Sequence, residues 1–172
     1  MIVGIIGAGT MGSGIAQAFA QVDGYEVRLC DINEEFAANG KLRITKTLEK
    51  RVAEGKMAKE DADKIIAKIK TGTKEICSDC DLIVEAAVEN VDIKRQPFKE
   101  LDKICKPECI FTTNTSSLSI TQIAAGLEHH VVGMHFFNPA PVMKLVEIIA
   151  GLNTPKEVAD RVVAIATEIG KT

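Results

Sequence analysis

A histidine and a glutamate stand twelve residues apart in the segment 131–149, "VVGMHFFNPAPVMKLVEII", in a chain with three histidines. The apolar runs on both sides are typical of strands, and the two prolines between them predict a loop. We expect Glu147 to share a strand face with Leu145 and Ile149, where a buried carboxylate needs a partner. His135, at the end of the neighbouring strand, suits that role, because a carboxylate that holds one ring nitrogen leaves the other free as a base. The alternative is a structural pair that closes the loop.

A glycine-rich stretch near the N-terminus has the pattern G-x-G-x-x-G, formed by Gly7, Ala8, Gly9, Thr10, Met11 and Gly12. It follows a short apolar run and precedes a helical pattern, the arrangement in which the free N–H groups of a helix N-terminus bind the phosphates of a dinucleotide. Asp31 closes the next strand about 20 residues later, where an acidic side chain accepts hydrogen bonds from a ribose and repels a 2′-phosphate. NAD is therefore favoured over NADP. The alternative is a turn that needs glycine only for its backbone, with Asp31 capping the following helix.

Polar residues follow a third strand in the stretch "CIFTTNTSS", which ends with Asn114, Thr115, Ser116 and Ser117. Ligands in a doubly wound sheet lie beyond the carboxyl ends of the strands, so these side chains are candidates for contacts with cofactor or substrate. One serine before a helix is also explained by capping. A dinucleotide site with a carboxylate-oriented histidine indicates a dehydrogenase that acts on an alcohol.

The fold class follows from the alternation of strand-like and helix-like segments, which predicts an α/β, Rossmann-type, doubly wound and mostly parallel sheet in one domain. Strands are predicted at 1–7, 25–31, 72–77, 81–86, 109–113, 131–136 and 144–149, and helices near 11–22, 91–105, 118–126 and 154–170. Residues 34–70 predict an inserted helical hairpin, with Ile69 on the apolar stripe of its second helix. The hairpin has ten basic and seven acidic residues, so it either receives a phosphorylated substrate or is simply solvated.

The amino-acid composition of the chain gives information about its binding partners and its location. The net charge of −3 gives no basic surplus that would favour nucleic acid or an anionic membrane, and no apolar run is long enough to span a bilayer. The cytoplasm is the expected location. The five cysteines occur without a secretory signal, which argues against a disulfide framework. Cys77, Cys80, Cys105 and Cys109 have spacings that could also form a zinc site, but they stand in apolar patterns where cysteine serves as a small hydrophobe, so no metal is expected.

Four stretches make the chain similar to a known family: "GAGTMGSGIAQAFA", "DLIVEAAVEN", "NTSSLSIT" and "GMHFFNPAPVMKLVEII". Over essentially its whole length the chain resembles the N-terminal domain of the L-3-hydroxyacyl-CoA dehydrogenases, most closely the bacterial 3-hydroxybutyryl-CoA members. The resemblance implies His135 as the general base, Glu147 as its orienting carboxylate and Ser116 as a contact of both substrate and nicotinamide. Besides the glycine loop, it implies NAD contacts at Asp31, Glu89, Lys94, Asn114 and Asn138.

The same resemblance implies that the hairpin binds coenzyme A, with Thr47 and Lys50 as contacts. Glu54 stands where the family has a lysine, with Lys56 close by. Family members continue into an all-helical domain that carries a catalytic asparagine, part of the acyl pocket and the dimer interface. We therefore expect residues 1–172 to be the NAD-binding half of a homodimeric enzyme, which binds NAD but turns an acyl-CoA substrate over poorly.

Two other functions remain open. A dehydrogenase of a free hydroxy acid or sugar acid would not need the basic hairpin, so inhibition by coenzyme A separates it from an acyl-CoA enzyme. A module that binds NAD without chemistry would need no proton-transfer group, which His135 with Glu147 argues against.

Overall fold

One seven-stranded sheet, in the order β3-β2-β1-β4-β5-β6-β7, organises the computed structural model, which describes residues 1–172. The strands are β1 (Ile2–Ile6), β2 (Glu26–Cys30), β3 (Ile69–Gly72), β4 (Leu82–Glu85), β5 (Ile110–Thr113), β6 (Val131–Phe136) and β7 (Val146–Ala150). All neighbouring pairs are parallel except β6 and β7, which are antiparallel. The predicted doubly wound, mostly parallel sheet is confirmed, and the carboxyl ends of its parallel strands meet along one edge.

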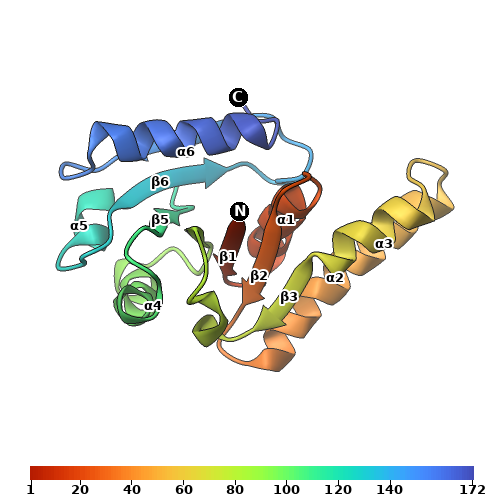
Figure 1. The fold of residues 1–172 in the computed structure, drawn as a ribbon, viewed down its shortest axis with the longest axis horizontal. Helices are drawn as coiled ribbons and strands as arrows, with labels where there is room; N and C mark the ends of the chain where they lie inside the picture. Colours follow the sequence, from red (N-terminus) through yellow and green to blue (C-terminus); the bar gives the residue numbers. More distant parts are fainter.

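Helices cover both faces of the sheet: α1 (Thr10–Ala20), α2 (Glu34–Ala53), α3 (Lys59–Ala67), α4 (Val91–Ile104), α5 (Ile120–Ala124) and α6 (Lys156–Glu168). The larger hydrophobic core lies between the sheet and α1, α2 and α6, and the smaller core, which holds all five cysteines, lies under α4 and α5. α2 and α3 form the predicted hairpin, which projects away from the sheet (Figure 1). None of the helices combines the length and the hydropathy that a membrane span requires.

The strand expected at 72–77 is misplaced. β3 spans Ile69–Gly72 and is followed by a short 3₁₀ helix, η1 (Lys74–Cys77). The reason is the partner strand: β2 ends at Cys30, which pairs with Gly72, so the ladder has no hydrogen-bonding partner beyond that residue. Ile69, expected on the apolar stripe of a helix, instead pairs with Val27 and is buried in the sheet.

The environment of Glu147 also differs from expectation. β7 is the edge strand, and the face that carries Glu147 is open to solvent, with Leu145 50% and Ile149 39% exposed. The apolar alternation suggested a buried face, but β7 packs mainly through its other face, where Val146 and Ile148 join the core that includes α6. Glu147 is therefore a half-exposed carboxylate, which can stay charged at little desolvation cost.

Candidate functional site

The glycine-rich loop joins β1 to α1 and leaves the first turn of the helix open. Gly9 is the N-cap, and no side chain accepts a hydrogen bond from the first helical N–H groups. A Cβ atom on Gly9 would have no neighbour within 4 Å, whereas one on Gly12 would lie 1.6 Å from the carbonyl oxygen of Gly7. Gly7 itself has a φ of +106°, which favours glycine. The loop thus needs Gly7 and Gly12 for its own fold, while Gly9 leaves room for a ligand at the positive end of α1.

Asp31 connects this loop to β2. One of its carboxylate oxygens accepts a hydrogen bond from the N–H of Ala8 at 2.7 Å, and the other accepts from the N–H of Ile32 at 2.7 Å. The capping alternative for Asp31 is wrong, because Asn33 is the N-cap of α2 and its side chain accepts from the N–H of Phe36. Asp31 thus sits beside the open end of α1, where the sequence placed a ribose-binding carboxylate.

His135 and Glu147 are directly opposite each other in the antiparallel ladder of β6 and β7. His135 Nδ1 lies 2.9 Å from Glu147 Oε1, and the side chain of His135 is 16% exposed. The ring packs against Phe137, with a centroid distance of 4.6 Å. No hydrogen bond within the chain engages Nε2. The pair therefore has the geometry of an oriented imidazole whose second nitrogen is free to exchange a proton.

The carboxylate of Glu89 accepts hydrogen bonds from polar residues that follow β5. Thr115 Oγ1 donates to Glu89 Oε1 at 2.6 Å, and the N–H and hydroxyl of Ser116 donate to Oε2 at 3.1 and 3.2 Å. Burial alone would raise the pKa of Glu89, but these hydrogen bonds and the charge of Lys94 outweigh it and lower the pKa below its ordinary value. Glu89 is thus an anion at neutral pH that fixes the position of Ser116. Ser119, not Ser116, caps α5, so the capping explanation of Ser116 is wrong.

The side chain of Lys94 is 2% exposed and lies next to Glu85 and Glu89. Its ammonium contacts both carboxylate oxygens of Glu85 and the carbonyl of Ala87, each at 3.1 Å, and is 3.8 Å from Glu89. Glu85 also accepts from Thr113 Oγ1 at 2.6 Å. The structure thus places Lys94 as a support of the Glu89 loop, and its direct contact with a cofactor stays a prediction. Glu85 was missed by the sequence reasoning, although a carboxylate that ends the apolar run "DLIVE" signals a buried partner.

Asn114 and Asn138 follow the ends of β5 and β6, two strands that pair in the sheet. Asn114 Oδ1 accepts from the N–H of Phe136 at 2.7 Å, which leaves its amide NH₂ group free. Asn138 precedes a cis peptide bond to Pro139. Both predicted cofactor residues therefore reach the same sheet edge as Ser116 and His135.

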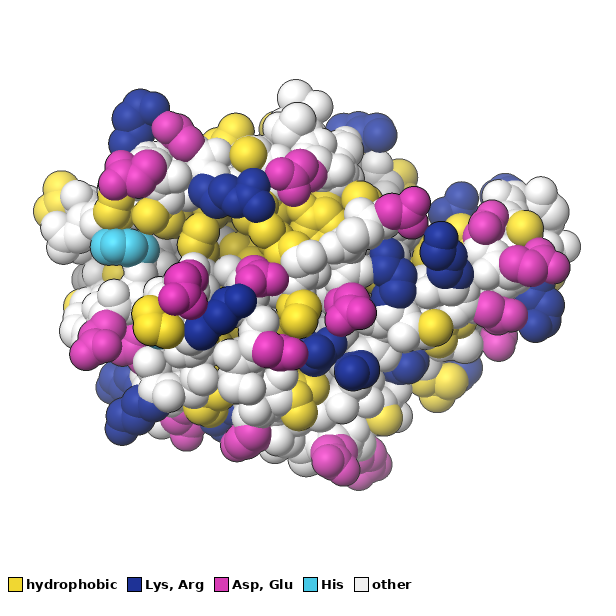
Figure 2. Space-filling view, viewed as in Figure 1, with side chains coloured by type: hydrophobic (Ala, Val, Ile, Leu, Met, Phe, Trp, Pro, Cys, Tyr) yellow, Lys and Arg dark blue, Asp and Glu magenta, His cyan; other side chains and the backbone are white.

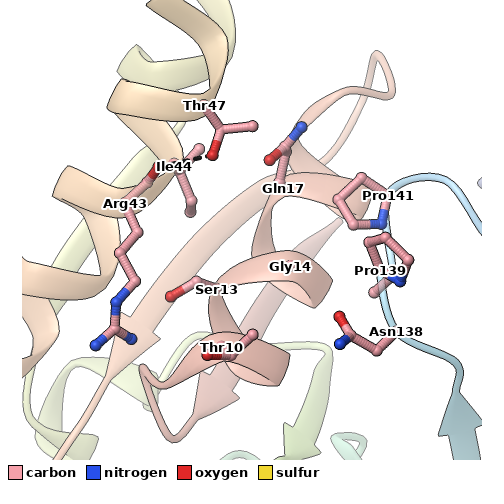
Figure 3. A pocket seen from close by; sticks show the side chains of 11 residues that line it. Thr10, Ser13, Gly14, Gln17, Arg43, Ile44, Thr47, Asn138, Pro139 and Pro141 are labelled. Carbon is pink, nitrogen blue, oxygen red and sulfur yellow. Dashed lines mark hydrogen bonds between the residues drawn. The ribbon is translucent and has the colours of Figure 1, made fainter. Parts of the chain in front are cut away.

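A cavity of about 210 Å³ lies between α1, α2 and the loop after β6 (Figure 3). It is lined by Thr10, Ser13, Gly14, Gln17, Arg43, Ile44, Thr47, Asn138, Pro139, Ala140 and Pro141. The structure thus brings Thr47, a predicted coenzyme A contact, to the same cavity as the predicted NAD contacts Thr10 and Asn138. Arg43 was missed as a site residue and was counted only among the hairpin's basic residues. Its Nη1 donates to the carbonyl of Ala8 at 3.0 Å, so a cation stands beside the glycine loop.

Lys50 does not line this cavity, and charges of both signs are interspersed over the projecting hairpin (Figure 2). Glu54 Oε1 is 3.9 Å from Lys50 Nζ, and Glu54 Oε2 is 3.0 Å from Lys56 Nζ. At this position, where the resemblance predicted a lysine, Glu54 pairs with the neighbouring lysines and partly neutralises their charge.

The five cysteines are all buried, and Cys30 Sγ lies 3.5 Å from Cys77 Sγ. No group of three or more His, Cys, Asp or Glu residues is arranged to hold a metal ion. The contact with Cys30 and, after it, burial raise the pKa of Cys77 far above its ordinary range, which keeps the thiol protonated. These side chains pack as small hydrophobes.

Comparisons with known proteins identify the family of the chain. Residues 2–172 match the family model described as 3-hydroxyacyl-CoA dehydrogenase, NAD binding domain. The chain is 46% identical to a probable 3-hydroxybutyryl-CoA dehydrogenase of Bacillus subtilis over 98% of this chain and 59% of that protein. It is 44% identical to the 3-hydroxybutyryl-CoA dehydrogenase of Clostridioides difficile over 99% of this chain and 62% of that protein.

A crystal structure of 3-hydroxybutyryl-CoA dehydrogenase from Escherichia coli K12 has the same fold, with a TM-score of 0.94 and 40% identity over 100% of this chain and 37% of that chain. The chain spans about 60% of the length of the curated relatives from Bacillus subtilis and Clostridioides difficile. The agreement of family model, relatives and sheet-edge geometry shows that this chain belongs to the 3-hydroxyacyl-CoA dehydrogenase family, as its NAD-binding domain.

Proposed function

We propose that the chain supplies the cofactor-binding and proton-transfer part of an NAD-dependent enzyme that oxidises L-3-hydroxyacyl-CoA to 3-oxoacyl-CoA and catalyses the reverse reduction. The observation that carries this proposal is the pairing of His135 with Glu147 at the sheet edge that also bears the glycine loop. The names of the relatives favour 3-hydroxybutyryl-CoA and acetoacetyl-CoA as the substrate pair.

The residues of the loop fit a dinucleotide. The open space above Gly9 and the uncapped N–H groups of α1 suit a pyrophosphate, and Asp31 suits the adenosine ribose beside it. Ile32 is 80% and Val88 69% exposed at the ends of β2 and β4, on either side of β1, and such apolar side chains suit the faces of an adenine ring. When bound, NAD supplies the hydride acceptor.

His135 performs the proton transfer in this proposal. In the oxidative direction, the free Nε2 accepts the proton of the substrate's 3-hydroxyl group while the C3–H hydride departs. Glu147 holds Nδ1 at 2.9 Å, so it fixes the ring orientation and stabilises the imidazolium that forms. In the reductive direction the same nitrogen donates the proton.

Ser116 positions the substrate oxygen. Its hydroxyl donates to the Glu89 carboxylate at 3.2 Å, and in this proposal it turns to donate to the substrate oxygen, because the substrate's own hydroxyl proton goes to His135. We propose that Asn114 and Asn138 bind the nicotinamide half of NAD, because both amides lie at the ends of the strands next to His135. Lys94 supports this arrangement through Glu85 and Glu89.

We propose that the coenzyme A part of the substrate lies along α2, with Thr47 as a contact at the cavity. Thr47 is exposed there, and its hydroxyl donates to the carbonyl of Arg43 at 3.0 Å, which leaves its lone pairs available. Lys50, which is 78% exposed, contributes charge that Glu54 partly neutralises. A cytoplasmic location and a homodimer of the longer protein belong to the same proposal, and the five free, buried cysteines support a reducing compartment.

The proposed function is tested by titrating the chain with NADH and then adding acetoacetyl-CoA while the absorbance of the reduced nicotinamide is followed. We expect saturable binding of NADH, followed by slow oxidation that depends on the coenzyme A ester and is absent with free acetoacetate. Binding without any oxidation would show that residues 1–172 alone do not carry the proposed proton transfer. Equal rates with the ester and the free acid would contradict the coenzyme A assignment, and no binding would contradict the cofactor assignment.

Asp31→Asn tests the choice between NAD and NADP. The change removes the negative charge that repels a 2′-phosphate but keeps an oxygen for the N–H of Ala8. We expect the ratio of NADPH to NADH affinity to rise by about tenfold, equivalent to about 1.4 kcal/mol. Asp23→Asn makes the same charge change in the turn before β2, at the opposite end of that strand, and should leave the ratio unchanged. Fluorescence titration with both cofactors measures this ratio of affinities. An unchanged ratio in Asp31→Asn would refute the role of Asp31 in discriminating NAD from NADP.

A further inference from the structure

The loop between β6 and β7 joins the strand that carries His135 to the strand that carries Glu147. It also carries Asn138, and its residues Pro139 to Pro141 form one wall of the cavity shared with α1 and α2 (Figure 3). The position of this loop therefore determines where the amide of Asn138 lies relative to the catalytic pair. What holds the loop is the segment that follows α6, because Lys171 and Thr172 form hydrogen bonds with it.

α6 ends in a Schellman motif that directs Lys171 toward the loop. Gly170 has a φ of +81°, the N–H of Lys171 donates to the carbonyl of Ala166 at 2.9 Å, and the N–H of Gly170 donates to the carbonyl of Thr167 at 3.0 Å. The next residue, Thr172, pairs with the backbone at the start of β7. Its N–H donates to the carbonyl of Lys144, and its carbonyl accepts from the N–H of Val146. The backbone around Lys171 is thus fixed on both sides.

The ammonium of Lys171 is buried inside the loop. The residue is 8% exposed, and Nζ donates to the carbonyl oxygens of Ala140 at 2.6 Å and Met143 at 2.8 Å. Burial lowers the pKa of this group, and the nearby charge of Lys144 lowers it further. Both hydrogen-bond partners are neutral, so the buried cation is held by the carbonyl dipoles of the loop. Such an arrangement specifies the loop conformation, because the two carbonyls must converge on one nitrogen.

We propose that Lys171 is a positioning residue for the nicotinamide half of the cofactor site, acting by holding the 137–145 loop that presents Asn138. The inference rests on the proposed function, which places the nicotinamide near His135. The order of the strands separates the two halves of the cofactor: Asp31 at the end of β2 lies on one side of β1, and β5 and β6 lie on the other. Loss of Lys171 should therefore affect the nicotinamide half and spare the adenosine half.

The test compares Lys171→Met with the wild-type chain in titrations with NADH and with AMP, which lacks the nicotinamide half. Methionine keeps much of the aliphatic length but cannot donate to Ala140 and Met143. We expect the Kd for NADH to rise about tenfold, the weight of one hydrogen bond, and the Kd for AMP to stay within about twofold. Lys144→Met is the matched control, because Lys144 is an exposed lysine in the same loop, and both of its Kd values should match the wild type.

Equal NADH affinity in Lys171→Met and wild type would overturn the inference, as would a parallel loss of NADH and AMP affinity, which indicates a general structural role. If Lys171→Met shows no cooperative thermal transition, Lys171→Gln, which keeps a donor nitrogen on a shorter side chain, is measured in the same way. Failure of both variants to fold would show that the lysine is required for folding and would also overturn the inference. A wild-type chain that binds AMP but not NADH would instead contradict the proposed function, so the two failures are distinguishable.

Discussion

His135→Gln is expected to lower the rate of acetoacetyl-CoA-dependent NADH oxidation by about a thousandfold, the weight of a well-placed general acid–base group. Glutamine can still donate a hydrogen bond to Glu147, but it cannot exchange a proton with the substrate at neutral pH. The affinity for NADH should stay within about twofold of wild type, because the glycine loop and Asp31 are unchanged. The measurements are the initial rate of absorbance loss and a fluorescence titration of NADH.

Two further variants test whether the loss of rate is specific to His135 and its carboxylate partner. His130→Gln has the same chemical change at an exposed histidine just before β6, and it should retain the wild-type rate. Glu147→Gln should give an intermediate rate, because the ring keeps a neutral partner but loses the charge that stabilises the imidazolium. A His135→Gln rate near that of wild type would refute the assignment of the base, whereas a parallel loss of NADH affinity would show that the histidine mainly shapes the cofactor site.

The parts of the fold that sequence reasoning predicted correctly are those with a strong local signal. The glycine loop, Asp31 and the His135–Glu147 pair each combine a special residue type with a strand end, and a parallel sheet brings strand ends together. The misplaced strand after α3 shows the limit of local signal. "TGTKEIC" has strand-like residues, but the length of β3 depends on where its partner β2 ends, which is a property of the pairing.

Burial was the less predictable quantity at the site. Alternating apolar residues around Glu147 indicated a buried face, yet β7 is an edge strand, and edge position depends on the topology of the whole sheet. Lys94 shows that burial can also exceed what residue type indicates, because lysines on helices are usually exposed and this one is buried against Glu85. Its burial depends on the carboxylate at the end of β4, nine residues earlier in the sequence. Contacts such as Arg43 with Ala8 bring residues from α2 and the β1–α1 loop together, and no local pattern predicts them.

Gly9→Ala is expected to weaken NADH binding by roughly 10- to 100-fold without changing the thermal stability of the free chain. The backbone of Gly9 is extended, with φ −76° and ψ −162°, which alanine adopts without strain, and its Cβ would contact no protein atom within 4 Å. The methyl group would instead project into the space above the helix N-terminus, where it would displace one or two charge-assisted hydrogen bonds to a phosphate. Fluorescence titration with NADH and a thermal melt measure the two quantities.

Gly12→Ala provides the contrast, because the same methyl group placed three residues later would lie 1.6 Å from the carbonyl oxygen of Gly7. We expect it to lower the free energy of unfolding by about 3 kcal/mol, the range of overpacking in a site that cannot relax. If the glycines served only the conformation of the turn, Gly9→Ala would be silent in both measurements and Gly12→Ala would affect stability alone. A stable Gly9→Ala chain with weakened NADH binding would show that Gly9 is required for the ligand and not for the fold, since the added methyl group contacts no protein atom within 4 Å.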